Sequence, residues 1–232
     1  MINFTPMLDS TTKDLLKNKE ILSDIGNMVG FPYSIILPSA IKDNISDFKN
    51  VFNKHQINHK IFFAHKCNQS SAVIKECLHN DINIDVSSER ELMHTLQNGY
   101  RGENILATGP KNKEFIWLAL QHKVTISIDS LNELQTVLHF CNKLNTLANI
   151  LIRINGADSN MVKKYSRFGL DDKELLSALK LLQSNPQINL LGLALHFDTI
   201  NLKEKVNGIK KRFKLMSRFF IFNKYERFFV DY

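Results

Sequence analysis

One lysine and one histidine stand where barrel enzymes carry their chemistry. Lys66 follows the apolar run Ile61–Ala64, and His196 closes a second apolar run, Leu191–His196. Both runs predict buried strands, and in barrels the reactive groups lie at the C-terminal strand ends. An amine there can form a Schiff base with an aldehyde cofactor, above all pyridoxal phosphate. The competing interpretations are a solvated surface lysine and a hydrogen-bonded core histidine.

The elements that would position these side chains alternate between strand and helix patterns. The expected strands are Tyr33–Leu37, Ile61–Ala64, Ile82–Val86, Asn104–Ala107, Thr125–Ile128, Ile150–Ile154, Leu191–His196 and Phe228–Asp231. The expected helices are Ile41–Lys54, Ser71–Asn80, Glu89–Gly99, Asn112–Gln121, Leu131–Leu144, Lys173–Ser184 and Leu202–Phe220. Alternation of this kind predicts parallel strands joined by crossover helices. Both a doubly wound sheet and a (β/α) barrel fit, and no G-x-G-x-x-G dinucleotide motif follows the first strand.

Local signals mark where several helices begin. Ser88 followed three residues later by Glu91 is a capping box, and Gly99 is placed to end that helix. Ser130 and Glu133 repeat the same spacing after the strand at Thr125–Ile128. These signals place the residues before each helix at the C-terminal ends of strands.

The composition limits the class of protein. The chain has 232 residues and a formal net charge of +7, but its basic residues are scattered, and the basic stretch from Lys203 to Arg227 fits a solvated helix face. A nucleic-acid role therefore rests on charge alone. Three cysteines suggest no disulfide framework and fit a reducing cytoplasm. We expect no signal peptide in residues 1–30, no membrane span and no metal site.

Seven segments, in order, resemble motifs of the fold-type III pyridoxal-phosphate enzymes, and most closely the ornithine/diaminopimelate/arginine decarboxylase family. Phe63–Asn68 resembles the A-x-K-A-N motif of the cofactor lysine, and Ile84–Leu92 resembles D-x-A-S-x-x-E-L. The further segments are Ile105–Lys111, Ile126–Leu134 (D-S-x-x-E-L), Leu151–Asn155 (L-R-I-N), Ser166–Leu170 (S-K-F-G) and Gly192–Phe197 (the strand ending in H-x-G-S). The order and spacing of the seven carry the resemblance.

The resemblance implies a fold and a division of the chain. It predicts an α/β protein with a (β/α)8 TIM-type, alanine-racemase-like barrel that is incomplete at the C-terminus. Residues 1–30 would form a helical extension and residues 31–232 the pyridoxal-phosphate-binding barrel. The C-terminal β-domain of the family would be absent.

The resemblance also implies a catalytic pair and a cofactor-binding arginine. Lys66 would hold pyridoxal 5'-phosphate and move a proton, and His196 would stack its ring on the pyridine face. Arg153 would line the cofactor site. It lies among apolar neighbours in a strand, where a charge is costly unless it is paired.

Five further residues receive roles from the resemblance. Asp85 and Glu91 would orient the lysine and the surroundings of the cofactor ring, although helix capping alone explains Glu91 equally well. Thr199 would keep the hydroxyl of the H-x-G-S motif near the cofactor phosphate. Ser166 and Phe168 would shape the substrate pocket from a loop.

Three departures from the family pattern affect the expected activity. Asp198 replaces a glycine near the cofactor phosphate, where an acid would repel the dianion and fill the space that glycine leaves. Cys67 replaces a small alanine, which is a milder change. The glycine-rich phosphate loop expected after Phe228–Asp231 is not found.

The sequence therefore predicts a decarboxylase-like protein for a basic or dibasic amino acid, truncated and impaired. One alternative is a non-catalytic pyridoxal-phosphate-binding pseudoenzyme. Another is a subunit that pairs with a full-length or complementary chain. A homodimer is also compatible with the family resemblance.

Overall fold

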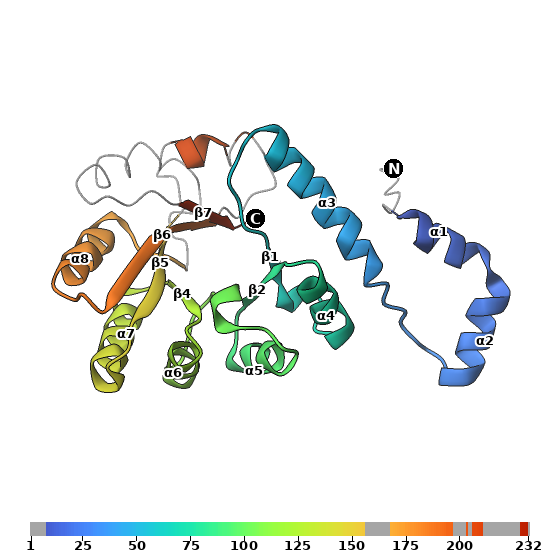
Figure 1. Ribbon diagram of the computed structural model, residues 1–232, viewed down its shortest axis with the longest axis horizontal. Helices are drawn as coiled ribbons and strands as arrows, with labels where there is room; N and C mark the ends of the chain where they lie inside the picture. Colours follow the sequence, from blue (N-terminus) through green and yellow to red (C-terminus); the bar gives the residue numbers. More distant parts are fainter. Residues whose placement is uncertain (1–7, 156–167, 197–202, 204–205, 211–227, 232) are drawn as a thin grey trace.

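The centre of the molecule is a parallel sheet of seven strands (Figure 1). The computed structural model describes residues 8–155, 168–196, 203, 206–210 and 228–231. The strands are β1 (Phe62–Ala64), β2 (Asn83–Val86), β3 (Ile105–Ala107), β4 (Thr125–Ile128), β5 (Ala148–Ile154), β6 (Ile188–His196) and β7 (Phe228–Asp231). Each pairs in parallel with the next along the chain. All C-terminal strand ends therefore lie at one edge of the sheet.

Helices connect successive strands and lie on the outer side of the sheet. They are α4 (Ser71–His79), α5 (Glu89–Gln97), α6 (Lys113–Gln121), α7 (Leu131–Leu144) and α8 (Asp172–Gln183), with the short 3-10 turns η1 (His65–Cys67) and η2 (Gly102–Asn104). A further helix, α3 (Ser39–Lys54), precedes β1 and contacts α4. Figure 1 shows α4 to α8 in an arc around the strands, as in part of a (β/α) barrel wall. In the described residues β1 and β7 each have a single neighbouring strand. The predicted α/β fold with parallel strands is confirmed.

The helices begin where their capping residues predict. Ser88 accepts a hydrogen bond from the backbone N–H of Glu91, and Ser130 accepts one from the N–H of Glu133. Each cap satisfies a donor that the first helical turn leaves without a partner. Gly99 follows the end of α5 with φ +96°, a conformation that L side chains rarely adopt. The predicted capping spacings thus set the start of α5 and α7.

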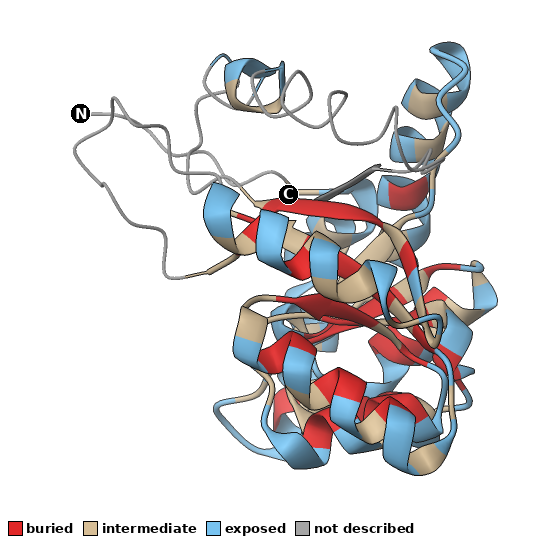
Figure 2. Cartoon of the chain, turned by 90° about the vertical axis from the view of Figure 1, so that its left-hand side faces the viewer, coloured by how far each residue is buried: buried red, intermediate tan, exposed pale blue. Residues whose placement is uncertain are grey.

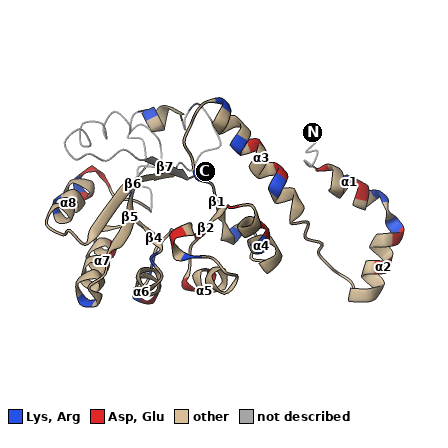
Figure 3. Cartoon of the chain, in the orientation of Figure 1, with Lys and Arg blue, Asp and Glu red and all other residues tan. Residues whose placement is uncertain are grey.

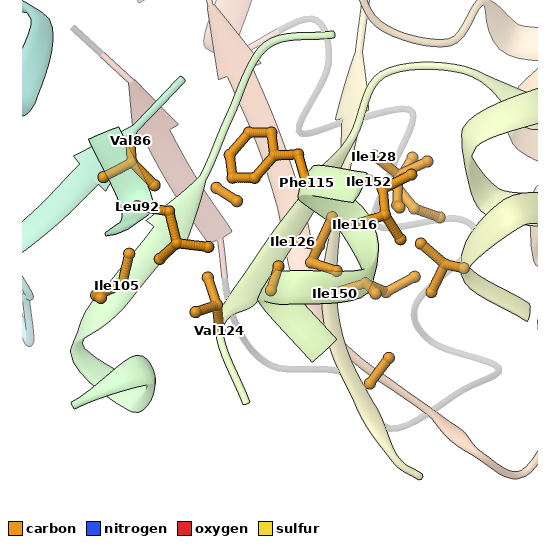
Figure 4. Close-up of a cluster of buried hydrophobic side chains, with 14 of the residues drawn as sticks. Val86, Leu92, Ile105, Phe115, Ile116, Val124, Ile126, Ile128, Ile150 and Ile152 are labelled. Atoms are coloured by element: carbon orange, nitrogen blue, oxygen red, sulfur yellow. The ribbon is translucent and has the colours of Figure 1, made fainter. Parts of the chain in front are cut away.

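The apolar side chains of the strands pack against the inner faces of the helices. Figure 4 shows this core, in which fully buried side chains of β2 to β5 meet Leu92 of α5 and Phe115 and Ile116 of α6. Figure 2 shows buried residues along the strands and exposed residues on the outer helix faces. Burying one such side chain is worth roughly 1.5–3 kcal/mol relative to exposing it. The near-continuous apolar runs of the sequence are therefore strands covered on both faces.

The predicted strand Tyr33–Leu37 is wrong. The segment forms neither helix nor strand, and Ile35 and Ile36 are exposed. Pro32 and Pro38 flank it, and a proline has no backbone N–H to donate to a neighbouring strand. No described strand lies beside it, since the seven strands pair only with one another. An apolar, β-branched run without a partner stays outside the sheet.

Two helical regions remain, one before the sheet in the chain and one between β6 and β7. The N-terminal helices α1 (Ser10–Lys17) and α2 (Lys19–Val29) lie apart from the sheet in Figure 1. Of the predicted helix Leu202–Phe220, the structure describes residue 203 and residues 206–210, all helical; the remainder lies outside the described residues. Within the part of the chain that is described, no helix is long and apolar enough to cross a bilayer. Figure 3 shows charges of both signs along the outer helices.

The core predicts different costs for two aromatic truncations on the same helix. Phe115 is 2% exposed and Trp117 is 44% exposed on α6. Phe115→Ala should destabilise the protein by about 3–5 kcal/mol because it leaves a cavity. Trp117→Ala, the matched control, should cost about 1 kcal/mol or less. Urea unfolding followed by circular dichroism measures both, and equal losses would contradict this packing.

Candidate active site

Lys66 lies on η1, immediately after β1, with its side chain exposed at the C-terminal edge of the sheet. No ion pair involves it within the described part of the chain. In the parallel register, Ala64 at the end of β1 is level with Asp85 of β2. The structure therefore brings Lys66 and Asp85 to the same edge, one strand apart.

Asp85 is buried and held by the next strand's loop. The hydroxyl of Thr108, which follows β3, donates to Asp85 Oδ1 at 2.6 Å, and its backbone N–H donates to the carbonyl of Val86 at 2.8 Å. A short bond to a carboxylate is a strong one. Asp85 is thus fixed at the strand edge, while its predicted role toward a cofactor stays a prediction.

Glu91 has two contacts that correspond to the two interpretations left open by the sequence. Its Oε2 accepts a hydrogen bond at 2.8 Å from the backbone N–H of Ser87, the residue before the N-cap Ser88, and so satisfies a donor at the start of α5. The same oxygen lies 4.0 Å from Nδ1 of His65, the residue beside Lys66. Glu91 therefore caps α5 and also faces the turn that carries Lys66.

Arg153 is paired, as its apolar surroundings require. Its Nη1 lies 3.3 Å from Oδ1 of Asp129, the residue that follows β4, and its guanidinium carbon lies 5.1 Å from the centre of the Phe168 ring. A cation over an aromatic face is attracted by the ring's quadrupole. Asp129 and Phe168 together fix Arg153 at the same edge of the sheet.

A second buried ion pair at this edge had no functional interpretation in the sequence. Lys111 Nζ, on a side chain that is 0% exposed, lies 3.2 Å from Glu133 Oε1. Glu133 also accepts from the backbone N–H groups of Lys111 at 3.0 Å and Asp129 at 2.7 Å. Burial lowers the pKa of Lys111 and raises that of Glu133, and their mutual attraction opposes both shifts. The Ser130–Glu133 spacing placed Glu133 in the first turn of its helix, but no local signal pointed to Lys111 as its partner.

Of the remaining residues discussed in the sequence analysis, the structure describes His196 but not Ser166, Asp198 or Thr199. His196 ends β6, half-buried, level with Asp231 of β7 in the register. It therefore lies on the Lys66 edge of the sheet. Ser166 and Thr199 lie outside the described residues, as does Asp198.

A cavity opens beside the two ion pairs. It has a volume of about 480 Å³ and is lined by the loops after β3 and β4 and by Phe168, including Lys111, Asp129 and Glu133. Small-molecule sites commonly have roughly 300–1,000 Å³. The loops at the C-terminal edge thus enclose space of the size a small ligand needs.

Residues 39–219 match the family described as pyridoxal-dependent decarboxylase, pyridoxal binding domain. The chain belongs to this family. The match confirms the resemblance drawn from the seven motifs and, at the level of the family, the predicted cofactor class.

Relatives agree with this assignment and extend well beyond the chain. A protein of Sinorhizobium fredii called y4yA is 28% identical over 91% of this chain and 46% of its own length. The biosynthetic arginine decarboxylase of Bacteroides thetaiotaomicron is 27% identical over 94% of this chain and 38% of its own length. The chain therefore spans less than half the length of these two relatives.

A solved structure supports the barrel fold. Diaminopimelate decarboxylase from Helicobacter pylori, complexed with L-lysine, superimposes with a TM-score of 0.76 at 20% identity, covering 91% of this chain and 55% of that one. At this identity the likeness shows the fold alone. This likeness confirms the predicted barrel fold of this chain.

The Lys111–Glu133 pair makes a testable contribution to stability. Lys111→Met should cost about 3–5 kcal/mol because it leaves a buried carboxylate without its counter-charge. Glu133→Gln should be similarly costly, and the double variant should cost less than the sum by about 1–3 kcal/mol. Urea unfolding of all four proteins measures this coupling.

The control for this cycle is Lys113→Met, which alters an exposed lysine two residues away. It should change stability by about 0.5 kcal/mol or less. Additive losses in the double variant would show that Lys111 and Glu133 do not stabilise each other.

Proposed function

We propose that this chain binds pyridoxal 5'-phosphate through Lys66 and forms the cofactor-binding part of a decarboxylase for a basic or dibasic amino acid. The observation that carries the proposal is the exposed Lys66 amine at the strand edge that also holds Asp85, Arg153 and His196. The substrate class follows from the relatives, which include an arginine decarboxylase and a diaminopimelate decarboxylase complexed with L-lysine.

The groups at this edge fit the chemistry of the cofactor. An aldehyde reacts with the lone pair of an accessible amine, and the Lys66 side chain is exposed. The cofactor is an anion with an aromatic ring, for which a fixed guanidinium and an imidazole are suitable neighbours. Arg153 and His196 supply these two groups.

Each residue has a separate task in this proposal. When bound, pyridoxal phosphate supplies an aldehyde and a ring that withdraws the electron pair left by a departing carboxylate. Lys66 would hold the cofactor through its Nζ, and this amine would give or take a proton. His196 would orient the ring by stacking, and Arg153, fixed by Asp129, would supply positive charge. Asp85 and Glu91 would orient the lysine and the surroundings of the cofactor ring.

The pocket residues complete the assignment from the sequence. Thr199 would offer its hydroxyl to the phosphate, and Ser166 and Phe168 would border the substrate. Phe168 already contacts Arg153 from the segment that follows β5. The task of Ser166 and Thr199 rests on the motif match, because both lie outside the described residues.

A second candidate is a non-catalytic cofactor-binding protein, or a subunit that works with a full-length or complementary chain. One observation favours it. Asp198 stands where the family pattern has a glycine near the phosphate. Cofactor binding without turnover is the result that would distinguish it.

Borohydride trapping tests the lysine assignment. After incubation with pyridoxal phosphate and reduction, a single phosphopyridoxyl group should be attached to Lys66, as located by peptide mass spectrometry. Lys66→Ala should lose the label and the visible absorbance of the complex. Lys75→Ala, which alters an exposed lysine of α4, should keep both. Labelling that persists in Lys66→Ala would contradict the assignment.

Carbon dioxide release then separates the two candidates. Arginine, ornithine, lysine and diaminopimelate are each offered to the chain alone, and then together with a full-length relative whose own cofactor lysine has been replaced. Release by the chain alone supports the decarboxylase. Trapping on Lys66 without release under either condition supports the non-catalytic protein.

A further inference from the structure

Two histidines connect the turn that carries Lys66 with the protein surface. His65 is 1% exposed, and its Nε2 lies 3.0 Å from Nδ1 of His94 on α5. Nε2 of His94 lies 2.9 Å from the hydroxyl of Ser71, an exposed residue at the start of α4. A continuous series of hydrogen-bonding atoms thus runs from a buried ring to solvent.

The inner end of this series faces Glu91. Nδ1 of His65 is buried without a hydrogen-bond partner, and Oε2 of Glu91 lies 4.0 Å away. This separation is about 1 Å longer than a hydrogen bond. The Glu91 side chain is 12% exposed and is anchored by the N–H of Ser87 at the strand edge. A small movement of one side chain would complete the series from Ser71 to Glu91.

The series can hold its protons in two orders. In one, Ser71 O–H donates to His94 Nε2, His94 Nδ1–H donates to His65 Nε2, and His65 Nδ1–H points to an ionised Glu91. In the other, a protonated Glu91 points to His65 Nδ1, His65 Nε2–H donates to His94 Nδ1, and His94 Nε2–H donates to Ser71. A neutral imidazole has one donor and one acceptor nitrogen, so both orders satisfy both rings.

We propose that His65 and His94 carry protons between solvent at Ser71 and the Glu91 carboxylate beside the Lys66 turn. A water proton reaches the Ser71 oxygen as the hydroxyl proton passes to His94 Nε2. The Nδ1 proton of His94 passes to His65 Nε2, and the Nδ1 proton of His65 passes to Glu91 Oε2. The balance is one proton taken from solvent and one carboxylate protonated.

The surroundings of the two rings disfavour a lasting positive charge on His65. Burial lowers the pKa of His65, Glu91 opposes this shift, and charge on His94 adds to it. Two cationic rings 3.0 Å apart would repel each other.

The proton route rests on the proposed function, because it would supply the proton that decarboxylation consumes. Replacing a carboxylate by hydrogen consumes one proton for each carbon dioxide released. The site must therefore take a proton from solvent in every turnover. His65 and His94 act through Glu91 and are positioning residues, not catalytic ones.

The exchange of the His65 ring N–H with water tests the route in the cofactor-free chain. In protein labelled with ¹⁵N-histidine, His94→Gln should slow this exchange by at least about tenfold, because exchange then requires local opening. Glutamine keeps a hydrogen-bonding group but cannot pass a proton through a ring. Damage to the structure would have the opposite effect and speed the exchange, so unchanged or faster exchange overturns the proposal.

Three further variants complete the experiment. Ser71→Val removes the outer hydroxyl at an exposed position and should also slow the exchange. His139→Gln, on an exposed residue of α7, should leave it unchanged. His65→Asn identifies the signal by removing it.

Lys66 trapping is measured separately, so failure of the route and failure of the proposed function give different results.

Discussion

The parallel pairing of the strands is the constraint on which the rest of the structure depends. Because β1 to β7 run in one direction and pair in chain order, every strand ends at the same edge, and every following helix begins there. Helix N-termini carry partial positive charge and unsatisfied N–H groups. Polar residues that are distant in sequence are therefore collected at this edge, where each needs a partner.

Two glutamates provide partners for polar groups at this edge in the same way. Glu91 and Glu133 each occupy the third position of their helix and accept a backbone N–H of the preceding loop. Each also extends toward the loop of the strand before, Glu91 toward His65 and Glu133 toward Lys111. The difference lies in the partner: the buried lysine forms an ion pair, while the buried histidine offers a ring nitrogen that can donate or accept a proton.

The same edge explains how the candidate site is held. Asp129 joins Arg153 to the loop that Glu133 caps, and Thr108 joins Asp85 to the next strand. Loops linked in this way stay in place because each contact crosses from one strand–helix unit to its neighbour. The candidate site is thus held by side chains from four neighbouring strand–helix units, which include β2 to β5.

The sequence by itself determined most of the strands and helices and the edge at which the candidate site residues lie. Thr125–Ile128 and Leu131–Leu144 coincide with β4 and α7 because apolar runs and capping serines act over a few residues. The same local signals placed Lys66, Asp85, Arg153 and His196 at strand ends. Tertiary structure alone decided the Lys111–Glu133 pair, 22 residues apart, and the His65–His94 contact, 29 residues apart. It also left Tyr33–Leu37 outside the sheet, because a strand requires a partner and a partner is set by strand order and register, which no local pattern contains.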